Sequence, residues 1–132
     1  MIYTHVVQYY ETDKMQIVHH SNYVRWMEEA RVFFLDKIGA SFVTLEEMGI
    51  LSPVLEVSCK YLSSVRFGES VDIDVNITEF KGRRLFVEYK MTNHSTKELV
   101  CTANSTHCFT FDGRVINLKK KFPEIYKNFK VE

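Results

Sequence analysis

The sequence has little proline or glycine and no excess of charge of either sign. Only 2 prolines and 5 glycines occur among its 132 residues, and no linker, repeat or low-complexity tract divides the chain. Its 17 basic and 17 acidic residues cancel, so no bulk electrostatic field attracts nucleic acid or an anionic membrane. We therefore expect a single domain over residues 1–132 that has no nucleic-acid partner.

Cysteine and long apolar segments are scarce as well. The three cysteines, Cys59, Cys101 and Cys108, form no CxxC pair, and their odd number fits a disulfide framework poorly. The longest stretch without Asp, Glu, Lys or Arg, residues 99–111, falls short of the ~20 apolar residues that a membrane span requires. The first five residues lack the basic and apolar regions of a secretion signal. These absences predict a cytoplasmic protein without a membrane span.

One segment of the chain is strongly helical. Residues 23–38 follow Ser21 and Asn22, two good N-cap types, and end before Gly39, a common C-cap residue. On a helical wheel, the apolar side chains of this segment form one broad face: Tyr23, Trp26, Met27, Ala30, Phe33, Phe34 and Ile38. Because the helix is apolar around most of its circumference, another element must wrap it.

The wrapping element is predicted by apolar and polar residues that alternate with a period of two. The predicted strands lie in residues 2–10, 55–61, 71–78, 85–92 and 99–111. Short turns such as Lys81-Gly82 between consecutive strands imply antiparallel pairing. The sequence therefore predicts an α+β fold, in which a curled antiparallel sheet of about five strands wraps one long central helix.

The loop that enters this helix holds the most reactive side chains. Asp13 precedes the helix N-terminus, where unpaired N–H groups and a partial positive charge stabilise an oxyanion. A carboxylate beside such donors can act as a nucleophile or a general base on a carbonyl, but an Asp that only caps its own turn has the same sequence pattern. His19 and His20 show no metal-ligand spacing with Asp13, and Glu28 and Arg31 form an i,i+3 pair that is usually structural.

The same loop and helix carry an extended motif, Tyr10-x-Thr12-Asp13-x-x-x-x-Val18-x-His20-x-x-Tyr23, followed by Glu28-x-Ala30-Arg31. This motif resembles the signature of hotdog-fold acyl-CoA thioesterases of the 4-hydroxybenzoyl-CoA thioesterase type. The branch that it resembles most is the bacterial one encoded beside the Tol–Pal system. The predicted order of strands and helix is also that of the hotdog fold, so the resemblance spans nearly the whole chain.

The resemblance implies a thioester hydrolase that uses no metal and no cofactor. It places the catalytic carboxylate on Asp13 and gives the backbone N–H of His20 the role of polarising the thioester carbonyl. Tyr23 and Glu28 match positions that line the same cleft between subunits, and Val18 belongs to the substrate-binding loop. The resemblance also implies a homodimer or a tetramer formed by two dimers, and the exposed sheet edges predict that two copies join their sheets edge to edge.

Gln16 departs from the family pattern, because relatives usually carry glycine at this position and often a second glycine at the position of Met15. Glycine permits a close approach of the backbone to the acyl group. We therefore expect Gln16 to contact substrate, where it either narrows the acyl pocket, donates a hydrogen bond or weakens the enzyme.

The expected substrate is an acyl-CoA, which the enzyme hydrolyses to a free carboxylic acid and CoA. Arg83 and Arg84, beside the Lys81-Gly82 turn, are the expected phosphate-binding residues, because the planar guanidinium group suits phosphate. Two alternatives remain open from sequence: a thioesterase that acts on acyl-carrier protein, and a hotdog dimer that binds acyl thioesters without turnover.

Overall fold

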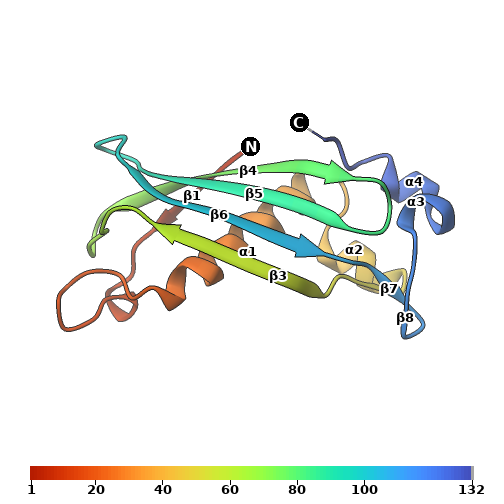
Figure 1. Ribbon diagram of the computed structural model, residues 1–132, viewed down its shortest axis with the longest axis horizontal. Helices are drawn as coiled ribbons and strands as arrows, with labels where there is room; N and C mark the ends of the chain where they lie inside the picture. The colour runs from red at the N-terminus through yellow and green to blue at the C-terminus, as the bar shows by residue number, and fades with distance from the viewer. Residues whose placement is uncertain (132) are drawn as a thin grey trace.

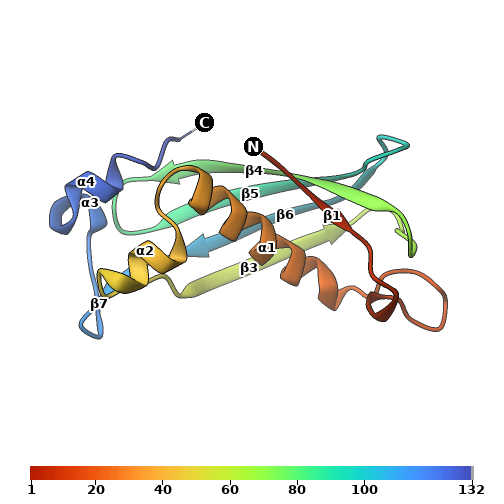
Figure 2. The same ribbon diagram turned by 180° about the vertical axis from the view of Figure 1, so that it is seen from behind.

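A five-stranded antiparallel sheet forms the main layer of the computed structural model, which describes residues 1–131. Its strands are β1 (Ile2–Val6), β3 (Val54–Tyr61), β4 (Ser70–Phe80), β5 (Leu85–Asn93) and β6 (Leu99–His107). They follow the order β1-β4-β5-β6-β3, and the long helix α1 (Ser21–Lys37) lies across one face of the curved sheet (Figures 1 and 2). The predicted α+β arrangement of one sheet around a central helix is confirmed.

The alternating strands at the centre of the sheet pair as their periodicity predicts. β4 and β5 pair from Val71 opposite Asn93 to Phe80 opposite Leu85, with one register shift between Ile77 and Glu79. The apolar residues of β4, from Val71 to Ile77, are buried at every second position and form the floor under α1. The polar residues between them face the other side of the sheet, which no helix of residues 1–131 covers (Figure 1).

The edge strand β3 departs from the half-buried pattern that its alternation predicts. All of its residues except Cys59 are exposed, and even Val57 retains 39% of its accessible surface. β3 pairs on one side with β6, and no strand of residues 1–131 pairs with its other side. The sequence periodicity is therefore correct, but a single chain supplies no element to cover this strand.

Helix α1 begins two residues earlier than predicted. His20 occupies the N-cap position, so Ser21 and Asn22 lie inside the first turn and do not cap it. The face that packs on the sheet includes Trp26 and Ala30, both fully buried. The helix ends at Lys37, and Gly39 adopts a left-handed φ of 82° that turns the chain away.

The other departures concern short elements without a periodic signal. β1 ends at Val6, and residues Tyr9–Glu11 form a 3₁₀ turn, η1, whose first two residues lie in the predicted strand over residues 2–10. The predicted strand over residues 99–111 is interrupted after His107, because the backbone N–H of Cys108 donates to the carbonyl of Pro53.

Short segments from residues 42–51 and 110–126 form a second, small layer at the far end of the sheet. Its three strands are β2 (Ile50–Leu51), β7 (Thr110–Phe111) and β8 (Arg114–Val115), and it is flanked by α2 (Phe42–Glu47), α3 (Leu118–Lys121) and α4 (Pro123–Tyr126). Among residues 1–131, no helix is both long and apolar enough to cross a membrane.

Candidate active site

A hollow of about 360 Å³ lies where the loop before α1 meets the N-terminal end of the helix and the end of β3. Its lining residues come from these three segments: Asp13, Ile17, Val18, His20, Tyr23, Tyr61, Leu62, Ser63 and Ser64. Four residues singled out from the sequence, Asp13, Val18, His20 and Tyr23, therefore share one hollow. The edge strand β3 supplies part of its wall, so the hollow opens beside the uncovered edge of the sheet.

The side chain of Asp13 caps its own turn with only one of its two carboxylate oxygens. Oδ1 accepts a hydrogen bond from the Met15 N–H at 2.8 Å. The Asp13 backbone is fixed on both sides, since its N–H donates to the Ile17 carbonyl and its carbonyl accepts from the Gln16 N–H, each at 2.9 Å. Oδ2 has no hydrogen-bond partner among residues 1–131 and remains available to a ligand. The turn-capping interpretation and the catalytic one are thus compatible.

The backbone N–H of His20 is oriented by a residue that the sequence analysis treated only as a possible cap. Asn22 donates to the His19 carbonyl through its backbone N–H at 3.0 Å and through Nδ2 at 3.2 Å. The carbonyl and N–H of one trans peptide point in opposite directions, so fixing the His19 carbonyl toward the helix directs the His20 N–H away from it. That N–H has no acceptor within the described residues, which leaves it free for a substrate oxygen.

Aromatic rings from the N-terminal end of α1 and from the end of β3 form part of the wall of the hollow. The rings of Tyr23 and Tyr61 meet edge to face with centroids 5.0 Å apart, and the His20 ring lies 6.2 Å from that of Tyr61. Burial, together with the neighbouring Cys101 and Tyr61, raises the pKa of Tyr23 to about 12. Tyr23 therefore lines the hollow as a neutral phenol and cannot serve as its general base.

The backbone conformation at Gln16 explains in part why glycine suits this position. Its φ is 66°, in the left-handed region, which costs a residue with a Cβ roughly 1 kcal/mol. The side chain is exposed and is not among the residues that line the hollow. Within one chain, the contribution of Gln16 is therefore made through its backbone, whose N–H holds the Asp13 carbonyl.

Glu28 does not share the Asp13 hollow within one chain. It lines a second hollow, of about 520 Å³, on the outer face of α1, together with Tyr3, Arg25, Glu29, Val32 and Phe33.

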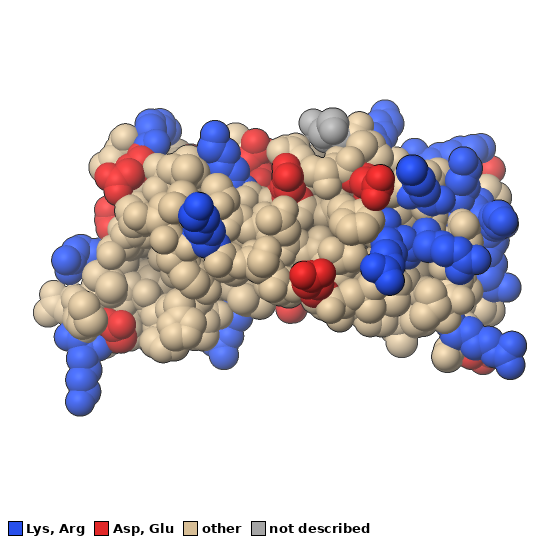
Figure 3. Space-filling view, in the orientation of Figure 1, with Lys and Arg blue, Asp and Glu red and all other residues tan. Residues whose placement is uncertain are grey.

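Arg83 and Arg84 lie at the opposite end of the sheet from the Asp13 loop, at the β4–β5 turn (Figure 1). The eleven residues of β4 separate the two ends by about 35 Å. Lysine and arginine side chains gather at the end that carries Arg83 and Arg84 (Figure 3).

Comparisons with known proteins agree with this geometry. Residues 7–128 match the model of the thioesterase-like superfamily. A Bacillus subtilis protein named "Putative acyl-CoA thioesterase YneP" is 32% identical over 89% of this chain and 86% of its own length.

The structural relatives are thioesterases of the hotdog fold. A DHNA-CoA thioesterase from Staphylococcus aureus is 29% identical, with a TM-score of 0.90 over 96% of this chain and 86% of that one. A variant of 4-hydroxybenzoyl-CoA thioesterase bound to 4-hydroxybenzoyl-CoA is 19% identical, with a TM-score of 0.83 over 95% of this chain and 96% of that one, a likeness of fold. The resemblance drawn from the loop and helix motif is confirmed.

Proposed function

Because the chain belongs to the thioesterase-like superfamily, we propose that it hydrolyses an acyl-CoA thioester to a free carboxylic acid and CoA. One observation carries the proposal: the Asp13 carboxylate and the unbonded N–H of His20 belong to residues that line the same hollow. A carbonyl carbon near Asp13 would have its oxygen polarised by that N–H, which is the arrangement that acyl transfer requires.

Two routes are open to Asp13. In the first, the carboxylate attacks the thioester carbon, expels CoA as the thiolate and forms a mixed anhydride that water then hydrolyses. In the second, Asp13 takes a proton from a water molecule that attacks the same carbon. A weakly basic carboxylate is sufficient in both routes because a thiolate is a good leaving group. The His20 N–H would stabilise the oxyanion in either case.

Release of free thiol from a panel of acyl-CoAs tests this function. The panel should vary chain length and include aromatic acyl groups, because Tyr23 and Tyr61 line the hollow. We expect turnover of at least one member with a kcat/KM well above that of the uncatalysed reaction. The absence of thiol release from every member would contradict the proposal and favour a protein that binds acyl thioesters without turnover. A cytoplasmic location fits a substrate carried by CoA and the three free thiols of the chain.

We also propose that two copies join through β3, because the site is incomplete at that edge. Val54, Leu55 and Val57 are exposed apolar residues on a strand with one unpaired side, a combination that isolated proteins avoid. Tyr61 and Leu62, next along the chain, line the Asp13 hollow. Antiparallel pairing of two β3 strands would bury these residues and close the hollow with the partner chain.

The dimer is tested by Val57→Lys, which places a charge on the edge strand. We expect the wild-type protein to sediment as a dimer or a larger assembly at micromolar concentration, and the variant to sediment as a monomer with at least ~10-fold lower kcat/KM. Val43→Lys is the matched control, because Val43 is an exposed valine on α2, away from the edge strand. A wild-type monomer that retains full activity would show that β3 is not the interface.

Arg83 and Arg84 are proposed to bind the phosphates of CoA in the assembled protein. Since the length of β4, about 35 Å, separates their end of the sheet from the end that carries Asp13 of the same chain, they would serve the site of another copy. Contact with the distant nucleotide is the same in the ground state and the transition state.

We expect Arg83→Ala/Arg84→Ala to raise KM for acyl-CoA about 10-fold and to leave kcat nearly unchanged. The same acyl group on a pantetheine analogue without phosphates should show no change in KM. Lys119→Ala/Lys120→Ala removes two charges from α3 at the same end of the molecule and is the control. An unchanged KM for acyl-CoA, or faster turnover of the same acyl group on acyl-carrier protein, would reject the assignment.

A further inference from the structure

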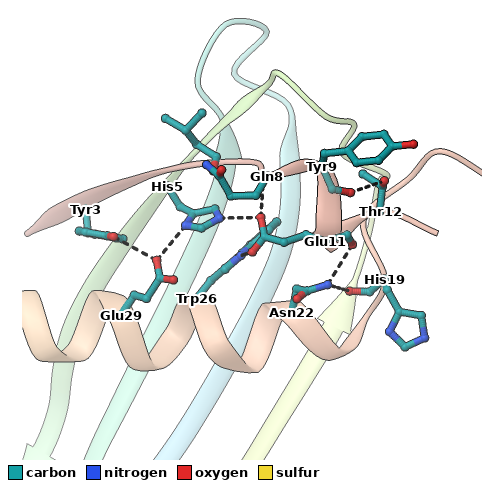
Figure 4. A network of polar contacts seen from close by, with 11 residues as sticks. Tyr3, His5, Gln8, Tyr9, Glu11, Thr12, His19, Asn22, Trp26 and Glu29 are labelled. Carbon is teal, nitrogen blue, oxygen red and sulfur yellow. Dashed lines mark hydrogen bonds and ion pairs between the residues drawn. The ribbon is translucent and has the colours of Figure 1, made fainter.

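A histidine outside the hollow is held between two carboxylates. His5 projects from β1 and is only 7% exposed. Its Nε2 lies 2.9 Å from Glu11 Oε1 and its Nδ1 lies 2.8 Å from Glu29 Oε2, while its ring stacks on Trp26 with centroids 4.6 Å apart (Figure 4). The two carboxylates belong to the loop before α1 and to α1 itself, so the imidazole connects three elements.

The two carboxylates constrain how this imidazole forms hydrogen bonds. An ionised carboxylate can only accept hydrogen bonds, so both ring nitrogens of His5 must donate. A histidine that donates from both nitrogens is the imidazolium cation. Tyr3 also donates to Glu29 Oε2, at 3.0 Å, so Tyr3 and His5 meet at the same carboxylate oxygen.

Glu11 is the most heavily bonded member of this cluster. Besides His5, its carboxylate accepts the Trp26 Nε1–H at 2.7 Å and the Gln8 N–H at 2.8 Å. Burial alone would raise the pKa of Glu11, but the donors on Gln8, His5 and Trp26 outweigh it and hold the pKa below its usual range. The group is therefore a buried anion whose stability depends on its hydrogen bonds and on the charge of His5.

The backbone carbonyl of Glu11 connects this cluster to the candidate active site. Its carbonyl accepts the His19 N–H at 2.8 Å and the Asn22 Nδ2–H at 2.9 Å (Figure 4). Asp13 lies two residues after Glu11, and His20 directly follows His19. One residue thus holds the two ends of the segment that carries the proposed nucleophile or base and the proposed oxyanion donor.

We propose that protonated His5 is a positioning residue, which fixes Asp13 relative to the His20 N–H by holding Glu11 in place. The proposal rests on the thioesterase function proposed above. Small displacements of reacting groups lower turnover strongly, with a misplacement of ~1 Å costing about 100-fold. Loss of the imidazolium should therefore lower kcat more than it raises KM.

The test is His5→Gln, which keeps a donor of similar size but removes the charge and one of the two hydrogen bonds. We expect kcat to fall about 10-fold with KM within about 2-fold of wild type. We also expect the His19 amide hydrogen, which donates to Glu11, to exchange with solvent about 10-fold faster. His94→Gln is the matched control, because His94 is an exposed histidine that pairs with one carboxylate, Asp72, at 2.9 Å, and should change neither quantity.

A double-variant cycle separates positioning from general stabilisation. Glu11→Gln removes the anion that His5 holds, so His5→Gln/Glu11→Gln should have a kcat within about 3-fold of His5→Gln alone. Effects that multiply would show that the two residues act independently and would overturn the proposal. An unchanged kcat and an unchanged His19 exchange rate in His5→Gln, even with a lower Tm, would also overturn it.

Two readouts do not depend on turnover. Nitrogen-15 chemical shifts of the His5 ring in the wild-type protein should show both nitrogens protonated at pH 7, and a neutral ring would overturn the proposal even if His5→Gln fails to fold. If no acyl-CoA is hydrolysed, the proposed function fails, whereas the His19 exchange rate and the ring shifts still decide the role of His5.

Discussion

Asp13→Asn is expected to lower kcat at least ~100-fold and to leave the fold intact. Asparagine keeps the shape of the side chain and an oxygen that can accept the Met15 N–H, but it has neither the nucleophilicity nor the basicity of a carboxylate. Thiol release measures the loss, and circular dichroism with thermal unfolding checks the fold. A variant that keeps more than a tenth of wild-type activity would show that Asp13 only caps its turn.

Two substitutions at His20 separate its side chain from its backbone. His20→Ala should cost less than Asp13→Asn, because the N–H survives, and a larger loss would reverse the assignment of roles. His20→Pro removes the N–H itself, and the φ of −55° at this position suits proline. We expect His20→Pro to lose about 100-fold in kcat, the scale of one oxyanion donor.

The free energy of unfolding is expected to fall by roughly 2 kcal/mol between pH 6.5 and pH 5, because of a buried histidine that the proposed chemistry does not use. His107 is fully buried, and its Nε2 lies 2.7 Å from Ser105 Oγ. A chain of hydrogen bonds continues from Ser105 Oγ to the hydroxyl of Tyr89, at 2.6 Å. That hydroxyl in turn accepts from Arg31 Nη1, at 3.2 Å. Nδ1 of His107 has no hydrogen-bond partner among the described residues 1–131, so in this part of the chain a second proton on the ring finds no acceptor.

The direction of the effect follows from the two protonation states. Burial, and secondly the charge of Arg31, lower the pKa of His107 to about 3 from an ordinary 6.5. Below pH 6.5 the His107 side chain takes up a proton in the unfolded chain but stays neutral in the folded one. Stability is therefore present in full above pH 6.5 and is lost as the pH falls toward 3, by at most about 5 kcal/mol.

Urea unfolding at pH 5, 6 and 7 measures this loss. His107→Leu should remove the slope between pH 6.5 and pH 5, whereas His94→Leu, at an exposed histidine, should retain it. Glu11, with its lowered pKa, contributes mainly at more acid pH, and the difference in slope between the wild-type protein and His107→Leu measures the part that belongs to His107. A variant without His107 that keeps the wild-type slope would assign the proton uptake to another group.

The parts of the fold that sequence could predict are those with a long periodic signal. The alternation from Val71 to Ile77 and the apolar wheel around Trp26 correctly placed the central strands and α1. The two-residue strands β2, β7 and β8 are too short to show any period, and the position of β3 at an edge depends on the order of strands in space. The assignment of residues 1–132 to one domain and the assembly of copies stay predictions.

The residues of the candidate site that belong to the sequence motif could be predicted, whereas those whose roles depend on hydrogen bonds formed in the folded chain could not. Asp13 and His20 were found from the loop and helix motif, and the structure places both at one hollow. Asn22 and Glu11 were missed, because their roles come from hydrogen bonds to distant parts of the chain. The spacing of Gln8 and Glu11, which form a capping box, was the one local signal that Glu11 is structured.

The Asp13 loop is a closed stem with an exposed tip, which bears on how such a protein diversifies. Thr12 bridges Val18 and the His19 N–H donates to the Glu11 carbonyl, which closes the stem. The tip holds Asp13 through the backbone N–H groups of Met15 and Gln16, whereas the side chains of Lys14, Met15 and Gln16 are exposed. Side-chain substitutions that preserve the backbone of the tip should therefore leave Asp13 and His20 in place, so substrate preference can change without loss of the proposed chemistry.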